Sequence, residues 1–163
     1  MLNEREMEIC VLSVGKISTS WIKDGIELFE SRIGKYIKFS VITVPDIKNA
    51  KNLSKESLKE EEGKFIMSNI IQSDYVVLMD EGGKELTSRD FASWIQKQMN
   101  SGRKRLVMII GGPFGFSQDI YQRADFKVAL SKMTFTHEMA KLILSEQLYR
   151  AMTILKGEPY HHD

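Results

Sequence analysis

The chain has 163 residues, of which 42% are hydrophobic and 28% are charged, and its net charge at pH 7 is +1. This length and composition predict one folded domain, residues 1–163, and exclude collagen-like, coiled-coil and disordered chains. The near-neutral charge argues against a binder of naked nucleic acid, although a basic patch on one face is still compatible with an RNA substrate.

No segment has the pattern of an exported or membrane-spanning protein. Residues 1–6 are charged, so we expect a short flexible extension and not a signal peptide. The longest apolar runs, residues 75–79 and 106–110, are much shorter than the ~20 residues of a membrane span. Cys10 is the only cysteine, which excludes an internal disulfide and a cysteine-rich zinc site. We therefore expect a cytoplasmic protein with no metal and no membrane partner.

The first predicted elements are a strand, a helix and a second strand. Residues 7–14 are apolar and partly β-branched, as in a buried strand. Apolar side chains then recur every three or four positions, which predicts a helix over residues 18–36. Residues 39–44 predict the second strand, which Pro45 stops.

Residues 48–64 form the most charged part of the chain. They begin with the pattern of a loop and change to that of a helix, for which Ser54 and Ser57 are both candidate N-caps. Because charged residues dominate, we predict a solvated helix face with no binding role.

A third strand is predicted over residues 74–80, and Gly82 and Gly83 are expected to turn the chain after it. A helix then begins at Thr87 or Ser88. It ends near residue 102, where a glycine precedes three basic residues.

The fourth predicted strand, residues 106–110, is purely apolar and runs into the glycine-rich loop 111–115. Ser117 is the expected cap of a short helix. Residues 126–130 predict a fifth strand, and residues 131–136 a loop.

A long helix over residues 137–156 closes the predicted order, and Gly157 stops it before a polar tail. Its expected apolar face consists of Met139, Leu142, Ile143, Leu148, Met152 and Leu155. The alternation of strands and helices predicts an α/β fold, with a mostly parallel sheet and helices on both faces. Ligands in such sheets bind at the carboxyl ends of strands, so the loops after residues 80, 110 and 130 are the candidate site.

The glycine loop 111–115 matches neither nucleotide-binding fingerprint. The dinucleotide pattern needs glycine where this chain has Pro113 and Phe116, and the phosphate loop needs a Gly-Lys-Ser/Thr sequence. From the residues alone, the loop is either a plain turn or a ligand cradle.

The loop 131–136 and the histidines also allow two interpretations. The loop's hydroxyl and apolar side chains either wrap an adenine or cap and pack the helix that follows. His137 either caps that helix or acts in catalysis. His161 and His162 lie in a tail that is either frayed or functional, and Tyr160 beside them favours function because an aromatic ring can stack on a base.

Four motifs resemble, in order, the ribosomal RNA large subunit methyltransferase H family. They are IIGGPFGFS, ALSKMTFTH, SEQLYRA and the terminal EPYHHD. The earlier VLSVGK and VVLMD are similar to the same family, so the resemblance extends from about residue 7 to the end of the sequence.

This resemblance implies a SPOUT fold with a C-terminal trefoil knot, which general topology rules would not suggest. It also implies a homodimer that binds S-adenosyl-L-methionine and methylates N3 of a pseudouridine in helix 69 of large-subunit ribosomal RNA, on assembled ribosomes. Carried over by position, the cofactor contacts are Met79, Gly112, Ser131, Lys132, Met133, Thr134, Phe135 and Thr136.

The tail residues Tyr160 and His161 are where the family places groups important for methyl transfer. Removing the N3 proton needs a base, and a histidine has a suitable pKa, so His161 is the first candidate and His137 the second. Tyr160 is expected to position the base or the substrate. The alternative functions are a non-catalytic RNA- or ribosome-binding module and a SPOUT methyltransferase for transfer RNA.

Overall fold

The computed structural model describes residues 6–162, so the predicted flexible extension lies almost entirely outside the described part. Strands and helices alternate along the chain as predicted. The strands are β1 (Glu8–Val14), β2 (Phe39–Val44), β3 (Tyr75–Glu85), β4 (Arg105–Ile110) and β5 (Phe126–Ala129). The helices are α1 (Ser20–Ile33), α2 (Lys55–Ser68), α3 (Ser88–Asn100), α4 (Gln118–Arg123) and α5 (His137–Leu155), with a short 3-10 turn, η1 (Ala50–Asn52).

The strands form one five-stranded sheet in the order β2-β1-β4-β3-β5. Every pairing in it is parallel, which confirms the predicted α/β class. β4, which is purely apolar after Arg105, lies at the centre, as expected for a strand that is buried on both faces. Strand order does not define how the chain threads, so the trefoil knot stays a prediction.

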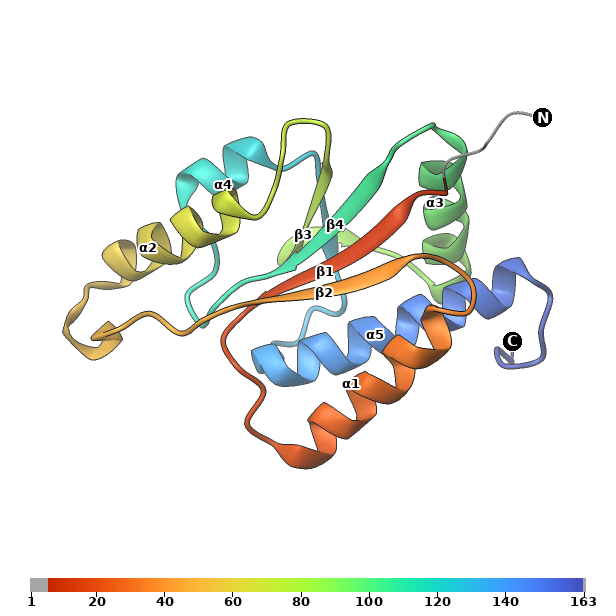
Figure 1. Ribbon diagram of the computed structural model, residues 1–163, viewed down its shortest axis with the longest axis horizontal. Helices are drawn as coiled ribbons and strands as arrows, with labels where there is room; N and C mark the ends of the chain where they lie inside the picture. Colours follow the sequence, from red (N-terminus) through yellow and green to blue (C-terminus); the bar gives the residue numbers. More distant parts are fainter. Residues whose placement is uncertain (1–5, 163) are drawn as a thin grey trace.

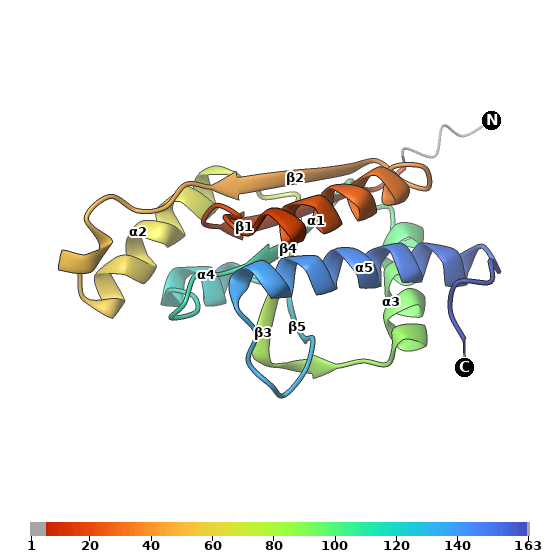
Figure 2. The same ribbon diagram turned by 90° about the horizontal axis from the view of Figure 1, so that it is seen from below.

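Helices cover both faces of the sheet (Figures 1 and 2). One apolar cluster joins α1, α3 and α5 to the sheet, and α5 packs against both of the other two helices. The second cluster joins α2 and α4 to the opposite face. Within residues 6–162, no helix is long and apolar enough to cross a membrane.

The predicted turn at Gly82 and Gly83 is wrong, because β3 continues through both residues. The pairing with β5 shifts register here: Met79 and Lys84 both lie opposite Val128. A Cβ atom on Gly83 would lie 2.7 Å from the backbone of β5. The glycine therefore serves close strand packing at a bulge, a tertiary requirement that resembles a turn signal in the sequence.

Two helices also differ from the prediction. α1 ends at Ile33, with Gly34 as its C-cap, so it is shorter than residues 18–36. In α5 the buried face includes Leu144, Leu148 and Met152, whereas Met139, Leu142 and Ile143 are only half-buried. The predicted apolar face was therefore partly wrong, and it leaves apolar side chains incompletely covered at the start of α5.

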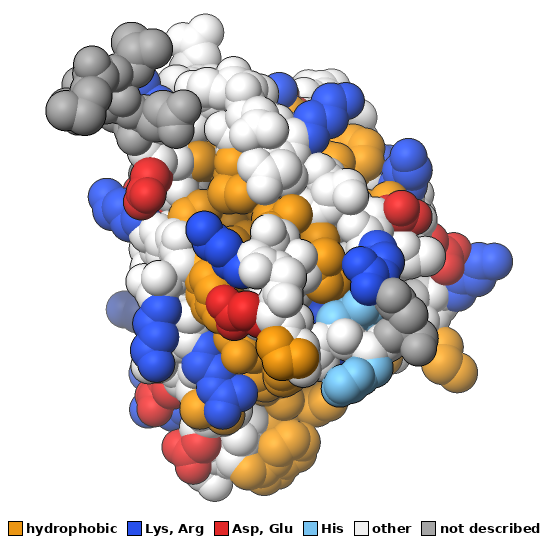
Figure 3. Space-filling view, turned by 90° about the vertical axis from the view of Figure 1, so that its right-hand side faces the viewer, with side chains coloured by type: hydrophobic (Ala, Val, Ile, Leu, Met, Phe, Trp, Pro, Cys, Tyr) orange, Lys and Arg blue, Asp and Glu red, His pale blue; other side chains and the backbone are white. Residues whose placement is uncertain are grey.

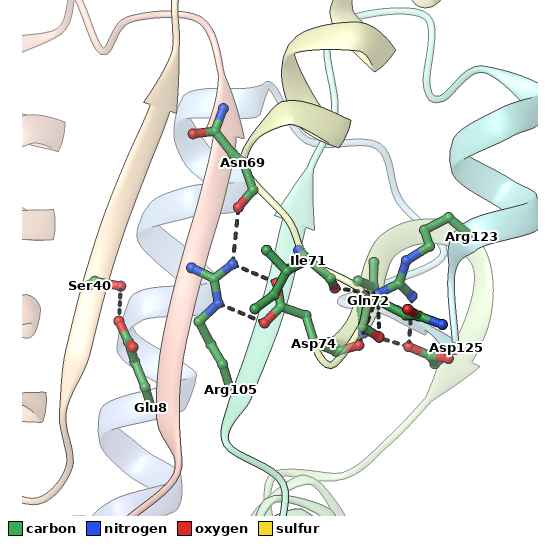
Figure 4. A network of polar contacts seen from close by, with 10 residues as sticks. Glu8, Ser40, Asn69, Ile71, Gln72, Asp74, Arg105, Arg123 and Asp125 are labelled. Atoms are coloured by element: carbon green, nitrogen blue, oxygen red, sulfur yellow. Dashed lines mark hydrogen bonds and ion pairs between the residues drawn. The ribbon is translucent and has the colours of Figure 1, made fainter.

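Polar contacts tie the strands together at the end of the sheet opposite the strands' carboxyl ends (Figure 4). The Arg105 guanidinium donates to both carboxylate oxygens of Asp74, at 2.9 and 2.5 Å, and to the Asn69 carbonyl at 3.0 Å. Burial acts to raise the pKa of Asp74, but hydrogen bonds from Arg105 and the Ile71 amide outweigh it and lower that pKa. Arg123 donates to the Asp74 carbonyl and to Asp125.

Candidate functional site

A cavity of about 780 Å³ opens at the carboxyl ends of β4 and β5 and beside the middle of β3, near where the fold class predicts a ligand site. Three loops and the start of α5 form its wall. The lining residues are 79–81, 110–116, 130–131, 133–137 and Ala140. The structure thus brings together Met79, Gly112 and the predicted loop after β5, which are far apart in the sequence.

The glycine loop that follows β4 is a tight turn. Gly112 and Gly115 form an isolated antiparallel bridge, and the Gly115 amide donates to the Gly112 carbonyl at 3.2 Å. Gly115 has a φ of +82°, which favours glycine. The structure thus confirms the turn, and because the same backbone lines the cavity, the ligand cradle stays a prediction.

The structure assigns Gly112 a neighbour that the sequence did not suggest. A Cβ atom at this position would lie 2.2 Å from Oε2 of Glu62 and 2.8 Å from its Oε1. The absence of a side chain at position 112 thus makes room for a carboxyl group behind the loop.

Glu62 is only 5% exposed, and its Oε1 has no hydrogen-bond partner among the described residues. Burial and, to a smaller extent, the negative charge of Asp46 together raise the pKa of Glu62 to about 7. The prediction that the charged segment 48–64 is wholly solvated is therefore wrong at this position. Leu58, Glu62 and Ile66 are spaced four apart, and this helical period was the signal that Glu62 lies on the buried face.

The loop 131–136 supplies most of the opposite wall. Its backbone is ordered by the Ser131 hydroxyl, which accepts from the Met133 amide at 3.0 Å. Thr136 is the N-cap of α5 and accepts from the Met139 amide at 3.2 Å. Met133 is 75% exposed at the cavity, although its sequence context also allowed a core position.

Lys132 is the one predicted cofactor contact that does not line the cavity. Its ammonium group lies 3.9 Å from the Glu85 carboxylate, and both side chains are well exposed. Its side chain therefore belongs to the outer surface of the loop.

Asp80 and Tyr121 form a polar pair at the cavity that the sequence did not reveal. Asp80 follows Met79 on β3 and lines the cavity. Its carboxylate accepts from the Tyr121 hydroxyl at 2.6 Å and from the Gly82 amide at 2.8 Å. Burial, followed by the hydrogen bond to Asp80, raises the pKa of Tyr121 to about 12, so this hydroxyl stays protonated and holds the carboxylate in place.

His137 lies at the cavity, in the first turn of α5. Its Nε2 is buried and has no hydrogen-bond partner within residues 6–162. The same nitrogen lies 3.3 Å from the position of a Cβ atom on Gly15, and Asp46 Oδ1 lies 3.1 Å from that position. His137 is thus the predicted catalytic residue that the structure places in the cavity wall.

Tyr160 and His161 lie at the other end of α5. The Tyr160 hydroxyl donates to Glu146 at 3.1 Å, and its ring packs against Tyr149 with a centroid distance of 4.7 Å. An α-helix rises about 1.5 Å per residue, so the two ends of this 19-residue helix are about 28 Å apart. The structure therefore separates the tail from the cavity within one chain.

The tail histidine is bonded to a cation. Nδ1 of His161 lies 3.1 Å from a guanidinium nitrogen of Arg150, which also donates to Glu146 at 2.6 Å. Arginine has no acceptor, so Nδ1 must accept this hydrogen bond and Nε2 carries the ring proton. To accept a proton on Nδ1, His161 has to leave Arg150.

Among the described residues, no group of three or more His, Cys, Asp or Glu side chains is arranged to hold a metal ion. The polar groups that line the cavity include backbone groups, Asp80 and His137.

The chain is similar to known proteins in both sequence and fold. A family model described as "Predicted SPOUT methyltransferase" matches residues 7–161. A protein of Christiangramia forsetii named "Ribosomal RNA large subunit methyltransferase H" is 49% identical over 156 residues, which cover 96% of this chain and 99% of that protein. The protein of the same name from Parabacteroides distasonis is 47% identical over 157 residues, covering 96% of this chain and 100% of the relative.

Among solved structures, a probable methylase family protein from Haemophilus influenzae superimposes with a TM-score of 0.52 at 12% identity. The match covers 100% of this chain and 72% of the other. At this identity, the likeness concerns the fold alone.

Proposed function

The chain belongs to the SPOUT methyltransferases and, among them, to the ribosomal RNA large subunit methyltransferase H family, and on this premise we propose that it methylates large-subunit ribosomal RNA. The observation that carries the proposal is the cavity at the strand ends, which unites Met79, Gly112 and the loop after β5. We propose N3 of a pseudouridine in helix 69 as the acceptor, on assembled ribosomes in the cytoplasm.

The cavity fits S-adenosyl-L-methionine in size and chemistry. Its volume of about 780 Å³ lies within the range of ordinary small-molecule sites. Backbone groups of the glycine loop and of residues 131–136 would hold the adenosine, with Met79 and Phe135 as apolar contacts. Asp80, held by Tyr121, offers a carboxylate for the amino group of the methionine part. When bound, the cofactor supplies an electrophilic methyl group on a sulfonium.

The residues of this chain would then align the acceptor and remove its proton. An imide nitrogen must lose its N3 proton to attack, and holding it in line with the methyl group supplies much of the acceleration. His161 is our first candidate for the base and His137 the second. For His161 this role requires release from Arg150, and Tyr160 would position the target base.

We propose that the tail acts in the cavity of a second copy of the chain. From the end of α5 to Tyr160 there are five residues, which span at most about 18 Å when extended, less than the ~28 Å length of the helix. The half-buried Met139, Leu142 and Ile143 offer apolar surface for such a homodimer. Figure 3 shows further apolar side chains beside the tail histidines, at the end of the molecule where α3 and the end of α5 lie.

We propose that whole ribosomes are preferred over free RNA. The net charge is +1, and several cations are already engaged within the fold. Arg105 pairs with Asp74, Arg150 pairs with Glu146, and Arg103 lies 3.8 Å from the centroid of the Tyr75 ring. A shaped ribonucleoprotein surface would add contacts that do not depend on a high net charge.

The test is binding followed by transfer. Calorimetry should show binding of S-adenosylmethionine and of S-adenosylhomocysteine, and labelled methyl groups should pass to ribosomes faster than to a helix 69 oligonucleotide. Absence of cofactor binding would overturn the proposed activity. Equal turnover of both substrates would overturn the preference for ribosomes.

A further inference from the structure

The further inference rests on the proposed cofactor and concerns a group outside the cavity. We propose that Glu62 is a specificity-determining residue. Its buried carboxyl lies against the backbone of Gly112 and loses its proton when a sulfonium cation enters the cavity. The resulting carboxylate favours the cationic cofactor over its neutral product.

The backbone of Gly112 separates the Glu62 carboxyl from the cavity. Gly112 lines the cavity, and the direction of its missing side chain leads to the Glu62 carboxyl, 2.2 Å from the position of a Cβ atom. Glu62 itself does not line the cavity. A charge on this carboxyl would therefore act through the glycine loop, where it is shielded from bulk water.

No cation is among the groups that shift the pKa of Glu62. The charged group that acts on it is Asp46, on the loop after β2, and Asp46 is negative. Ser117, the N-cap of α4, lies beside the next residue of α2. Its neutral hydroxyl is 2.7 Å from the position of a Cβ atom on Gly63. On α2 itself, Glu61 pairs with Lys64 on the exposed side.

An unpartnered buried carboxyl without a cation holds its proton more firmly than usual, and the pKa of about 7 agrees with this. A positive charge arriving nearby reverses the balance, because it stabilises the carboxylate. S-adenosylmethionine carries a sulfonium charge that S-adenosylhomocysteine has lost. Binding of the first should therefore release a proton from Glu62, and methyl transfer should be followed by its return, which weakens retention of the product.

Calorimetry near pH 7, in two buffers with different ionisation enthalpies, measures this proton directly. For the unaltered protein, S-adenosylmethionine binding should release up to about half a proton per site, whereas S-adenosylhomocysteine binding should release almost none. In Glu62→Gln, the release should vanish, and the ratio of the two affinities should fall by about threefold to tenfold. Glu60→Gln changes the same charge on an exposed part of α2 and should behave like the unaltered protein.

The outcomes separate the two proposals. If neither ligand binds the unaltered protein, the proposed cofactor is wrong. If S-adenosylmethionine binds but Glu62→Gln releases the same proton as the unaltered protein, another group such as His137 is its source and the inference about Glu62 is overturned. Binding of S-adenosylhomocysteine to Glu62→Gln at unchanged affinity shows that the variant is folded with its cavity intact.

Discussion

The carboxyl group of Glu62 occupies the space where a side chain at position 112 would begin, with Oε2 2.2 Å from the position of a Cβ atom on Gly112. The two residues come from α2 and from the loop after β4, and they meet behind the cavity wall. A larger side chain at position 112 is therefore expected to disturb both the loop and the helix.

Gly112→Ala should displace the Glu62 carboxyl or the loop, because no real Cβ atom approaches an oxygen this closely. We expect a loss of about 1–3 kcal/mol in the free energy of unfolding, as for other overpacked sites. Cofactor affinity should fall as well, since the displaced loop lines the cavity. Urea unfolding and calorimetry measure the two effects.

The matched control is the double variant Gly112→Ala with Glu62→Ala. Shortening residue 62 opens the space that the new methyl group needs, so the pair should be coupled and much of the lost stability should return. Strictly additive effects would mean that the clash is relieved elsewhere and that Glu62 does not determine the loop position.

Glu62→Gln should stabilise the protein at high pH. The pKa of Glu62 is raised from 4.5 to about 7 in the folded chain, so its favourable contribution is fully present below pH 4.5 and is lost as the pH rises through about 7. Relative to the unaltered protein, the variant should gain up to about 3 kcal/mol between pH 5 and pH 8. Unfolding curves at both pH values, with Glu60→Gln as control, test this; a pH-independent difference would contradict it.

Much of the fold follows from periodicity in the sequence. The apolar runs of β1 and β4 and the three- and four-residue spacing of α1 were sufficient to predict these elements. For α2 the sequence offered two N-caps, Ser54 and Ser57, and the structure uses Ser54. Gly82 and Gly83 misled the prediction, because a glycine needed for close packing against β5 has the same local signature as one needed for a turn.

The site was predictable only in part. The loops that follow β4 and β5 could be expected to meet, and Gly112 and all of residues 131–136 except Lys132 do line one cavity. Met79 lies within β3 and was expected there only from the family resemblance. Glu62 was missed because its charged neighbours outnumber the two apolar residues that share its face of α2. His137 and His161 are separated because α5 is one unbroken helix between them. No local pattern in the tail predicts the position of Tyr160 and His161 relative to that helix.

Asp74→Asn should destabilise the end of the sheet opposite the cavity. The Asp74 side chain is 1% exposed and pairs with Arg105, so the variant leaves a largely buried cation without its counter-ion. We expect a loss of about 3 kcal/mol at neutral pH. Because the folded pKa of Asp74 is lowered, the stability that it provides is present above pH 3.8 and falls as the pH drops below that value.

Chemical unfolding at pH 7 and at pH 3 measures this effect. The difference between the unaltered protein and Asp74→Asn should shrink at the lower pH. Glu61→Gln breaks an exposed pair with Lys64 and should leave stability almost unchanged at both values. An Asp74→Asn variant as stable as the unaltered protein at pH 7 would refute this account of the network.

His161→Ala should lower methyl transfer about 10²- to 10⁴-fold, the usual effect of losing a general base, while cofactor affinity stays unchanged. His162→Ala, which alters an exposed neighbour, should have a much smaller effect. Single-turnover transfer to ribosomes and calorimetry give the two quantities. Removal of residues 160–163, of which residue 163 lies outside the described part of the chain, should reproduce the His161→Ala loss.

Full activity of the truncated chain would instead direct the search for the base to His137. The same truncated chain tests the exchange of tails between copies. It is mixed with a variant whose cofactor binding is impaired, such as Gly112→Ala. Activity should return in mixed dimers, because the intact cavity of the truncated chain then meets the intact tail of the Gly112→Ala chain. Activity equal to the sum of the separate variants would contradict the exchange.

The central claim, methyl transfer to large-subunit ribosomal RNA, is tested most directly by nucleoside mass spectrometry. Ribosomes that lack the modification are incubated with the purified protein and S-adenosylmethionine, and their large-subunit RNA is digested and compared with an untreated sample. We predict one new methylated pseudouridine, located in helix 69 and absent without the cofactor. Unchanged large-subunit RNA after full incubation with a protein that binds the cofactor would contradict the account.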